Sequence, residues 1–539
     1  MSATRPEQKY VPFPLQGQLD QEATPIFVDG FVTAQNLVYQ RHEAIGKRTG
    51  TGPYGGAGTV GTGKPVISGV RWYAGQPSVL KSLIVQSNDG IYLGTDVGGT
   101  FAKIGTLTAS STPAFYAGVF DATNTGGAAM NSDILVIAYG SGQPKKWDGT
   151  NFTNLSASIT NPFTGCTFWH QHVWFWGDPS FPDTLWATDL ANPEGFVFMN
   201  TFSPPGYIIG QGDGDPTIQC AIGSGNVLCA FKTNSIYAVS GFDFLSSEYP
   251  FQISPLVLGN GTPSPHSVVA MPDGAVVWWN GLNFYEMYPG LTNPTAIGDP
   301  ITNEIAIAAN NSQSAIRAVG GDFFLPSTIY GPGNYNNFYM CAIDSGTGLA
   351  DTILVYDRSQ RKKKPAWTVW TGLTIGSFIP FNGPGDQRIL YFGSAASDQV
   401  SYLGQNSMND AGSAITVMLQ TGKTDYHSPN QIKEMDRLWV NAEANTATFQ
   451  VQVISDQSAS SFAAAQLFIL PQGGIWGVGV WGTMLWGPSA ATSYQSAEVN
   501  IDPALRGLNF TFLLVESSAT SAYELTAVTS HAIEEAYSK

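Results

Sequence analysis

The stretch at residues 264–287, SPHSVVAMPDGAVVWWNGLNFYEM, decides the fold class of this chain. Short apolar runs alternate in it with the turn residues Pro-Asp-Gly at 272–274 and Asn-Gly at 280–281. Asn-Gly between apolar runs is a strong hairpin signal, because a type I′ turn needs two residues that tolerate positive φ. The stretch therefore predicts three short strands joined by tight turns. Such a meander cannot bury its own apolar faces and must stack on other sheets.

The same pattern of strand, turn and strand recurs along residues 66–404, for example at 81–94, 133–155, 217–240 and 389–403. The copies share a pattern rather than letters and amount to roughly six units of about 55 residues, at the long end of the range for propeller blades. Radial stacking of four-stranded blades buries both faces of each sheet. The chain is therefore predicted to be all-β, with a roughly six-bladed β-propeller at residues 65–405.

The two flanks differ from the propeller in texture. Residues 1–64 are predicted to form an extended N-terminal arm and a propeller-completing strand, with 31–39 as the candidate strand. The Gly/Thr-rich residues 49–64 are expected to be a flexible loop rather than a phosphate-binding loop, since no P-loop motif leads into a helix. Longer alternating strands predict a β-sandwich-like domain with a Trp-Gly loop at 406–539, and only residues 530–537 suggest a helix.

Composition narrows the classes of function. The 539 residues include 60 glycines and 33 prolines, 12% are aromatic and only 12% are charged, which is typical of an all-β protein and unlike a disordered one. The 24 basic and 40 acidic residues give a net charge of −16, which disfavours a sequence-reading DNA-binding protein. We expect neither a signal peptide nor a membrane span, because no apolar run is long enough. The four cysteines are expected to be buried free thiols.

The sequence contains only weak candidates for catalytic or metal-binding residues. Acidic residues near blade ends are interpreted as turn residues. The His-x-His pair is expected on one strand face with zinc-like spacing, but it lacks a third metal ligand, and packing among the surrounding tryptophans is the interpretation. A GDGD segment at 212–215 lacks the remaining ligands of a calcium loop, and residues 96–101 match only part of an Asp-box turn. We predict no catalytic residue, metal or cofactor. The residues weighed were Asp213, Asp215, Asp243, Glu248, His170 and His172.

Two segments are candidates for contacts with other molecules. Trp476, Trp481 and Trp486 lie on a glycine-rich loop and are predicted to contact an interface or a ligand, with packing on their own domain as the alternative. The only basic run of the chain, Arg361, Lys362, Lys363 and Lys364, lies at a hairpin tip. It is a candidate channel or subunit contact, with a solvated turn as the alternative.

Several segments together resemble the β-propeller tail hub or nozzle proteins of short-tailed bacteriophages, a group that includes DNA-stabilisation proteins. The resemblance rests on Arg41, Lys47, Arg48 and Gly50, on residues 264–287, on EMDRLWVNA at 434–442, and on the Trp-Gly repeats. It implies a structural virion protein of the viral tail, at the head-tail connection, that is not an enzyme and has no cofactor.

The resemblance also implies partners and location. Such proteins form homohexameric rings, contact portal or adaptor proteins and tail fibre or tailspike proteins, and extend a channel that retains double-stranded DNA and conducts it during DNA ejection. They are assembled in the host cytoplasm. The sequence leaves two alternatives open, a glycan-binding or glycan-cleaving propeller and a scaffolding propeller inside a bacterial cell.

Overall fold

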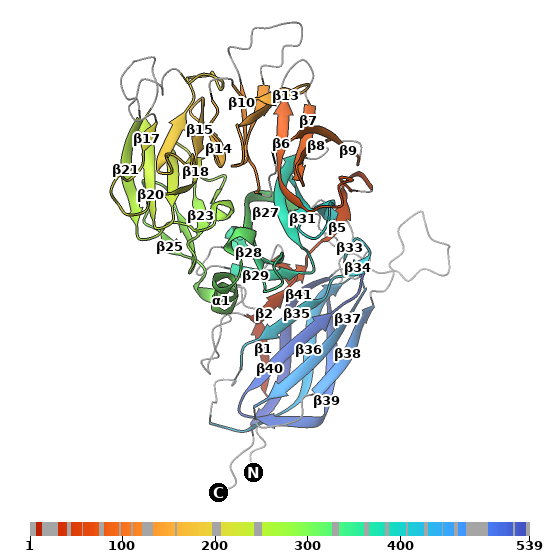
Figure 1. The fold of residues 1–539 in the computed structure, drawn as a ribbon. Helices are drawn as coiled ribbons and strands as arrows, with labels where there is room; N and C mark the ends of the chain where they lie inside the picture. The colour runs from red at the N-terminus through yellow and green to blue at the C-terminus, as the bar shows by residue number, and fades with distance from the viewer. Residues whose placement is uncertain are drawn as a thin grey trace, which may run out of the picture.

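Seven four-stranded antiparallel blades surround a central channel in the part of the chain that the structure describes. Five of them are separate sheets, and the other two are parts of a nine-stranded and a six-stranded sheet. The structure is a computed structural model that describes residues 7–12, 31–39, 45–56, 58–74, 80–95, 99–108, 112–120, 133–156, 159–196, 206–241, 251–325, 334–360, 366–382, 388–405, 408–424, 430–444, 446–456, 462–469, 494–520 and 523–534. The propeller fills the upper part of Figure 1, and a β-sandwich extends below it. The predicted all-β fold class is confirmed.

The first four blades follow one another along the chain, and the strands of each are given from the channel outward. They are β6 (Val66–Ala74), β7 (Leu80–Ser87), β8 (Gly90–Thr95) and β9 (Phe101–Thr106) in blade one; β10 (Phe115–Phe120), β11 (Asp133–Ala138), β12 (Lys145–Trp147) and β13 (Phe152–Asn154) in blade two; β14 (Gly165–Trp169), β15 (His172–Trp176), β16 (Thr184–Ala187) and β17 (Tyr207–Ile208) in blade three; β18 (Ile218–Ser224), β19 (Val227–Lys232), β20 (Ser235–Gly241) and β21 (Phe251–Leu258) in blade four.

The last three blades are built in the same way, except that the seventh takes its outer strand from the N-terminal part of the chain. Their strands are β22 (Val269–Ala270), β23 (Val276–Trp279), β24 (Phe284–Met287) and β25 (Thr295–Ala296) in blade five; β26 (Arg317–Leu325), β27 (Asn334–Asp344), β28 (Ala350–Asp357) and β29 (Ala366–Thr371) in blade six; β30 (Ile375–Asn382), β31 (Arg388–Ser394), β32 (Val400–Gln405) and β5 (Gly50–Pro53) in blade seven.

The inner strands close into a ring, because each contacts the next from β6 through β30 and β30 contacts β6. The blade number is one above the expected six, since the blades are shorter than the assumed repeat. The prediction that residues 31–39 complete the propeller was wrong. The completing strand is β5, which pairs antiparallel with β32. It lies in the stretch 49–64 that was expected to be a loop, where glycines hid the strand from a search for apolar runs.

The opening stretch forms most of blade five, and its apolar run is explained by burial on both faces. Val276 and Trp278 pack with residues of blade four, whereas Val277 and Trp279 pack with residues of blade six. All four side chains are fully buried. Successive side chains of a strand point to opposite faces. A blade between two neighbours therefore needs a continuous apolar run rather than an alternating one.

The two turns of this stretch differ in how well they were predicted. Gly274 has a positive φ of 85° in the tight turn after Met271, as the Pro-Asp-Gly signal predicts. The predicted two-residue type I′ turn at Asn280 was wrong. Trp279 pairs with Phe284, so the loop has four residues, and the Asn280 side chain accepts hydrogen bonds from the backbone of residues 282 and 283. The asparagine acts through its side chain rather than through a positive φ.

The β-sandwich is built from both ends of the chain. One sheet has the order β3-β4-β41-β36-β39, with β1 also paired to β41, and the other contains β2-β35-β40-β37-β38. The strands are β1 (Glu7–Pro12), β2 (Phe31–Gln35), β3 (Leu37–Tyr39), β4 (Ile45–Lys47), β35 (Val417–Thr421), β36 (Lys433–Ala444), β37 (Thr446–Ser455), β38 (Phe462–Ile469), β39 (Tyr494–Gly507), β40 (Phe510–Glu516) and β41 (Tyr523–Glu534). The helix expected at residues 530–537 was wrong, because β41 runs through Glu534.

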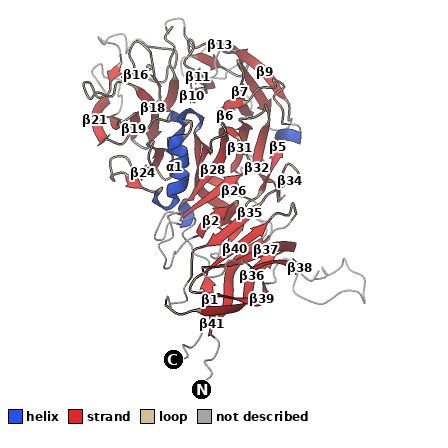
Figure 2. Ribbon diagram, turned by 60° about the horizontal axis from the view of Figure 1, so that its bottom comes forward, coloured by secondary structure: helices blue, strands red, loops and turns tan. Residues whose placement is uncertain are grey.

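One sheet runs without interruption from the propeller into the sandwich, in the order β26-β27-β28-β29-β2-β35-β40-β37-β38. The N-terminal strand β2 joins the two parts, since it lies parallel to β29 of blade six and antiparallel to β35. Figure 2 shows β2 and β35 between the blades and the rest of the sandwich. Residues assigned by sequence to a separate arm thus belong to the cores of both parts.

Short helical and bridging elements complete the described structure. The helix α1 (Thr302–Asn310) connects blades five and six, and no described helix is long and apolar enough to cross a membrane. The remaining elements are β33 (Asn409–Asp410), β34 (Ser413–Ala414) and the 3-10 helices η2 (Tyr54–Gly56), η4 (Pro265–Ser267), η5 (Asp299–Ile301), η6 (Gln313–Ala315) and η7 (Arg358–Gln360).

Candidate functional site: the propeller channel and the junction

An aromatic stack crosses the central channel where the inner strands begin. Phe115, the first residue of β10, stacks on His266 of η4, with ring centroids 4.5 Å apart and planes 14° apart. Blades two and five are separated by two blades on one side of the ring and by three on the other. A contact between them must therefore span the axis. The stack obstructs the channel at this level.

Trp176 and Arg317 lie near the stack. Trp176 meets Phe115 edge to face at 5.1 Å. Arg317, at the start of β26, donates hydrogen bonds to the carbonyl oxygens of Gly376, Ser314 and Ile316 at 2.9, 2.7 and 2.8 Å. Burial lowers the pKa of His266 well below its usual value, and the positive charge of Arg317 lowers it further. The histidine is therefore a neutral aromatic ring at neutral pH.

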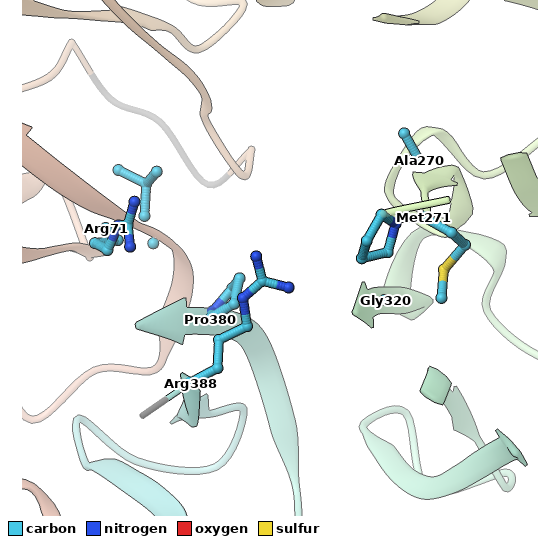
Figure 3. Close-up of a pocket in the computed structure, with 9 residues that line it drawn as sticks. Arg71, Ala270, Met271, Gly320, Pro380 and Arg388 are labelled. Atoms are coloured by element: carbon cyan, nitrogen blue, oxygen red, sulfur yellow. The ribbon is translucent and has the colours of Figure 1, made fainter. Parts of the chain in front are cut away.

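A cavity of about 440 Å³ lies among the strands that face the channel (Figure 3). Blades one, five, six and seven contribute to its wall. Two guanidinium groups, those of Arg71 and Arg388, are its charged components, and the rest of the wall is apolar or glycine. The lining residues are Gly69, Val70, Arg71, Ala270, Met271, Pro272, Gly320, Pro380 and Arg388.

Arg48 organises the junction between propeller and sandwich. All five N–H groups of its guanidinium donate hydrogen bonds. Two of them reach Asp410 as a bidentate pair at 2.9 and 2.5 Å. The others reach Oδ1 of Asn36 and the carbonyl oxygens of Thr49 and Thr371. The guanidinium also lies 5.8 Å from the ring centroid of Trp370. Arg48 itself is fully buried.

Asn36 links the same segments from the opposite side. Its backbone has a positive φ of 56°, and its side-chain oxygen accepts hydrogen bonds from Arg48 Nε and from the backbone N–H of Thr371. Its amide nitrogen donates to the Thr371 hydroxyl and the carbonyl oxygen of Thr416. Asparagine suits this position because it tolerates left-handed backbone and offers both donors and an acceptor.

Beside Arg48, Lys47 forms a second buried ion pair. Its Nζ lies 2.9 Å from Oε2 of Glu516, and both side chains have no exposed surface. Burial lowers the pKa of Lys47, although the hydrogen bond from Lys47 to Glu516 opposes that change. The Lys-Arg pair singled out in the sequence therefore anchors the junction, and Gly50, two residues on, lies directly against Asn409. A Cβ at Gly50 would come within 1.9 Å of the Asn409 carbonyl oxygen.

A third buried cluster fastens blade five to blade six. Arg358 of η7, with 3% of its side chain exposed, donates to Glu286 and Asp273 of blade five and to Asn337 of β27. Burial on its own would raise the pKa of Asp273, but hydrogen bonds from Arg358 and Tyr288 outweigh it and lower that pKa to about 2. The cluster is an ion-pair network between blades.

The candidate contact residues named from sequence fall outside the described residues. This applies to Trp476, Trp481 and Trp486 of the Trp-Gly loop, to Arg361, Lys362, Lys363 and Lys364 of the basic run, and to Arg41, Asp243 and Glu248. The structure therefore brings none of them to a described site, and their roles stay predictions.

The residues weighed for chemistry and then set aside have structural partners. Asp213 pairs with the buried Lys232 at 2.8 Å and accepts a hydrogen bond from Tyr237, and Asp215 accepts one from the backbone of Asn234. The described residues contain no group of three or more His, Cys, Asp or Glu side chains placed to hold a metal ion. The four cysteines are free and buried, as predicted.

The His-x-His pair does not share one strand face as its spacing suggested. His170 has a positive φ of 48° in the turn between β14 and β15, and its ring stacks on Trp169 at 3.9 Å. His172 is buried and its Nδ1 lies 2.6 Å from the Thr188 carbonyl oxygen. Packing among aromatic rings, predicted as the ordinary interpretation, is confirmed.

The backbone of the glycine-rich stretch binds a side chain of the same protein. Its successive backbone N–H groups at Gly61, Thr62 and Gly63 do converge on an anion, namely the Asp398 carboxylate of blade seven, at 3.0, 2.9 and 3.0 Å. The stretch thus anchors the N-terminal part of the chain to the blade that β5 completes.

Sequence reasoning missed several residues of these sites. Arg71, Arg388, Arg317 and Asp410 were not named, because single charged residues at strand ends carry no local motif. Basic residues are scarce in this chain, with 24 lysines and arginines in 539 residues. An arginine within a predicted propeller strand was therefore unusual enough to be named as a candidate.

Comparisons with known proteins add little. No protein-family model matches the sequence, and no curated protein does. Among solved structures, the extracellular domain of BT4673 from B. thetaiotaomicron aligns with a TM-score of 0.40 and 9% identity, over 91% of this chain and 63% of that one. A crystal structure of BBS1N in complex with ARL6DN aligns with a TM-score of 0.40 and 8% identity, over 66% of this chain and 96% of the other. Similarity this low carries no argument about function.

Proposed function

We propose that this protein is a structural component of a short-tailed bacteriophage virion. In this role it is one subunit of a homohexameric tail nozzle or hub ring below the portal and adaptor. The ring extends the DNA channel, retains the packaged DNA and conducts it during ejection. The protein performs no catalysis in this role and takes no cofactor.

The observation that carries the proposal is the continuous sheet between propeller and sandwich. Strand β2 lies in hydrogen-bonding register with both β29 and β35, and the buried Arg48 ties blade six, β33 and the N-terminal strands together beside it. Domains joined by a linker move relative to each other by default. A shared sheet with a buried ion pair instead makes one rigid subunit, which suits a part of a permanent assembly.

The obstructed propeller channel supports an arrangement in which several copies form a ring. Because the Phe115–His266 stack crosses the axis, DNA has no route through the propeller itself. A conduit would have to be enclosed between copies arranged in a ring. Closed rings of identical subunits form through head-to-tail interfaces.

The charge of the chain is compatible with a conduit for DNA. A net charge of −16 provides no broad attraction for phosphate, so DNA could slide past without being retained by counterion release. The assignment to a virion comes from the resemblance of the sequence to tail nozzle proteins. The net charge adds only that the protein would not retain DNA.

Negative-stain microscopy of the purified protein, together with mass spectrometry of purified virions, tests the proposal. We expect rings with six-fold symmetry, or the same rings in isolated tails. A protein that stays monomeric over the micromolar range and is absent from virions would contradict it.

A further inference from the structure

The cavity in the propeller channel contains two arginines without a partner among the described residues. Arg71 of β6 and Arg388 of β31 both line it, and neither side chain makes a hydrogen bond or an ion pair within the part of the chain that the structure describes. Figure 3 shows Arg388 extending from its strand toward the space between Arg71 and Met271. Two like charges therefore line one cavity.

The other described arginines behave differently. Each has a carboxylate or carbonyl partner within hydrogen-bonding or ion-pair distance, namely Arg48, Arg317, Arg358, Arg437 and Arg506. Taking a guanidinium partly out of water without a counter-charge is unfavourable. A chain with 40 acidic residues places none of the described ones against this pair.

Three glycines line the cavity or lie beside it. A Cβ at Gly320 would come within 2.2 Å of the Met271 sulfur, and one at Gly69 would come within 2.4 Å of Ile379. Nη1 of Arg388 lies against Gly321, where an added Cβ would be only 3.3 Å away. At Gly69 and Gly320 the added atom would collide with a neighbouring side chain, so both positions are closely packed. Glycine therefore lets the inner strands of blades one and six approach their neighbours beside the cavity.

From this arrangement we propose that the cavity is a binding site for a small oxyanion, a carboxylate or phosphate group carried on a short apolar body. The guanidinium groups of Arg71 and Arg388 bind the anionic group, since the planar fork of arginine matches carboxylate and phosphate oxygens. The apolar body packs against Val70, Met271 and Pro380. The proposal is independent of the virion function, because it concerns one propeller rather than the ring.

The size and lining of the cavity define the ligand class. A volume of about 440 Å³ lies within the usual range for small-molecule sites, which are largely apolar with a few placed polar groups. With two cations in the wall, a ligand bearing two negative charges is favoured over one bearing a single charge. Succinate fits this description as an organic acid, and inorganic phosphate supplies the oxyanion alone.

Isothermal titration calorimetry of the full-length protein with succinate and with inorganic phosphate tests the proposal. Dimethyl succinate, in which both charges are removed, serves as the ligand control, and sodium chloride is used to match ionic strength. The variants are Arg71→Gln and Arg388→Gln. Arg437→Gln is the matched control. That arginine is exposed on the sandwich, and its replacement removes the same charge as the two channel substitutions.

We expect saturable binding of at least one of the two anions, a loss of about 10-fold or more in affinity in each channel variant, and no change in the Arg437 variant. Binding of succinate alone, phosphate alone or both would each support the site and identify the source of the oxyanion. No binding of either anion would overturn the proposal. Equal losses in all three variants, or binding of dimethyl succinate with the same affinity, would also overturn it.

A second pair of variants covers the case in which a glutamine substitution prevents folding. Arg71→Lys and Arg388→Lys keep the charge but lose the planar fork. Weaker binding in these lysine variants, with an unchanged melting temperature, would support bidentate recognition. Unchanged affinity in both would refute it.

Discussion

Arg48 and Asp410 lie 362 residues apart in the sequence and form a bidentate ion pair, with nitrogen–oxygen distances of 2.9 and 2.5 Å. The pair joins the turn between the N-terminal strands to the segment that leaves the last blade. It therefore ties the propeller to the sandwich at the point where the N-terminal strands pass from one to the other. Stability at this point depends on a contact that no local sequence encodes.

Arg48→Ala is expected to reduce the free energy of unfolding by about 3–5 kcal/mol, because it leaves Asp410 and Asn36 without their buried donor. Arg48→Lys should cost less, since it keeps the charge but loses the fork. Chemical denaturation followed by tryptophan fluorescence measures both. Arg437→Ala is the control, as its contact with Glu498 is 3.7 Å long and 52% of its side chain is exposed, so a change below about 1 kcal/mol is expected. Equal effects of Arg48→Ala and Arg437→Ala would contradict the assigned role.

Gly50→Ala is expected to displace the strand that completes the propeller. The added methyl group would lie 1.9 Å from the Asn409 carbonyl oxygen, a backbone atom that cannot rotate away. Overpacking of this kind costs about 1–3 kcal/mol. Limited proteolysis and thermal denaturation would show faster cleavage and a lower melting temperature. Gly118→Ala, at a strand position with open space around it, should leave both unchanged. A Gly50 variant as stable as the Gly118 variant would show that β5 docks differently.

Because His266 is buried, we expect the protein to become less stable at mildly acidic pH. Its pKa in the folded protein lies well below its usual value near 6.5, so below that pH the unfolded chain binds a proton that the folded chain does not. Stability should therefore fall as the pH decreases from about 6.5 toward the folded pKa.

His266→Phe keeps the stack with Phe115 and removes the titrating group. Melting temperatures at pH 7.5 and pH 5.5 should differ less in this variant than in the native protein. An unchanged pH dependence in His266→Phe would exclude the histidine as its source.

Arg358→Met is expected to destabilise the protein by about 3–5 kcal/mol at neutral pH, since it leaves the buried Glu286 without its guanidinium. The difference between the native protein and this variant should narrow at low pH. The pKa of Asp273 is about 2 in the folded protein, so its stabilising contribution is complete above its usual value near 3.8 and is lost as the pH falls toward 2. Urea denaturation at pH 7 and pH 3 measures the difference, and a constant difference would argue against the network.

The blade pattern could be predicted because it is local. Residues 276–279 are apolar at every position since each side chain meets one of two neighbouring blades, and the glycine turn before them requires a positive φ that the sequence announces. The four-residue loop at Asn280 was not predicted, because the same Asn-Gly pair is compatible with two turn geometries. Local propensity fixes that a turn occurs but not always which one.

The channel and the junction could not be predicted. Arg71 and Arg388 approach one cavity only because the ring closes, and Phe115 reaches His266 only because blades two and five face each other across the axis. The motif around Arg48 was visible in the sequence, but its partner Asp410 was not, since a carboxylate far along the chain has no distinguishing context.

The sequence by itself determined an all-β chain of repeated short strands with a different, longer-stranded C-terminal part. That information lies in periodicity and turn residues, which act over a few positions. Only the tertiary structure decided that seven blades close the ring, that β5 completes it and that β2 joins propeller to sandwich. These outcomes depend on pairing between distant backbone segments, whose hydrogen bonds almost every residue type can make, so that the partner of a strand is not marked in the sequence.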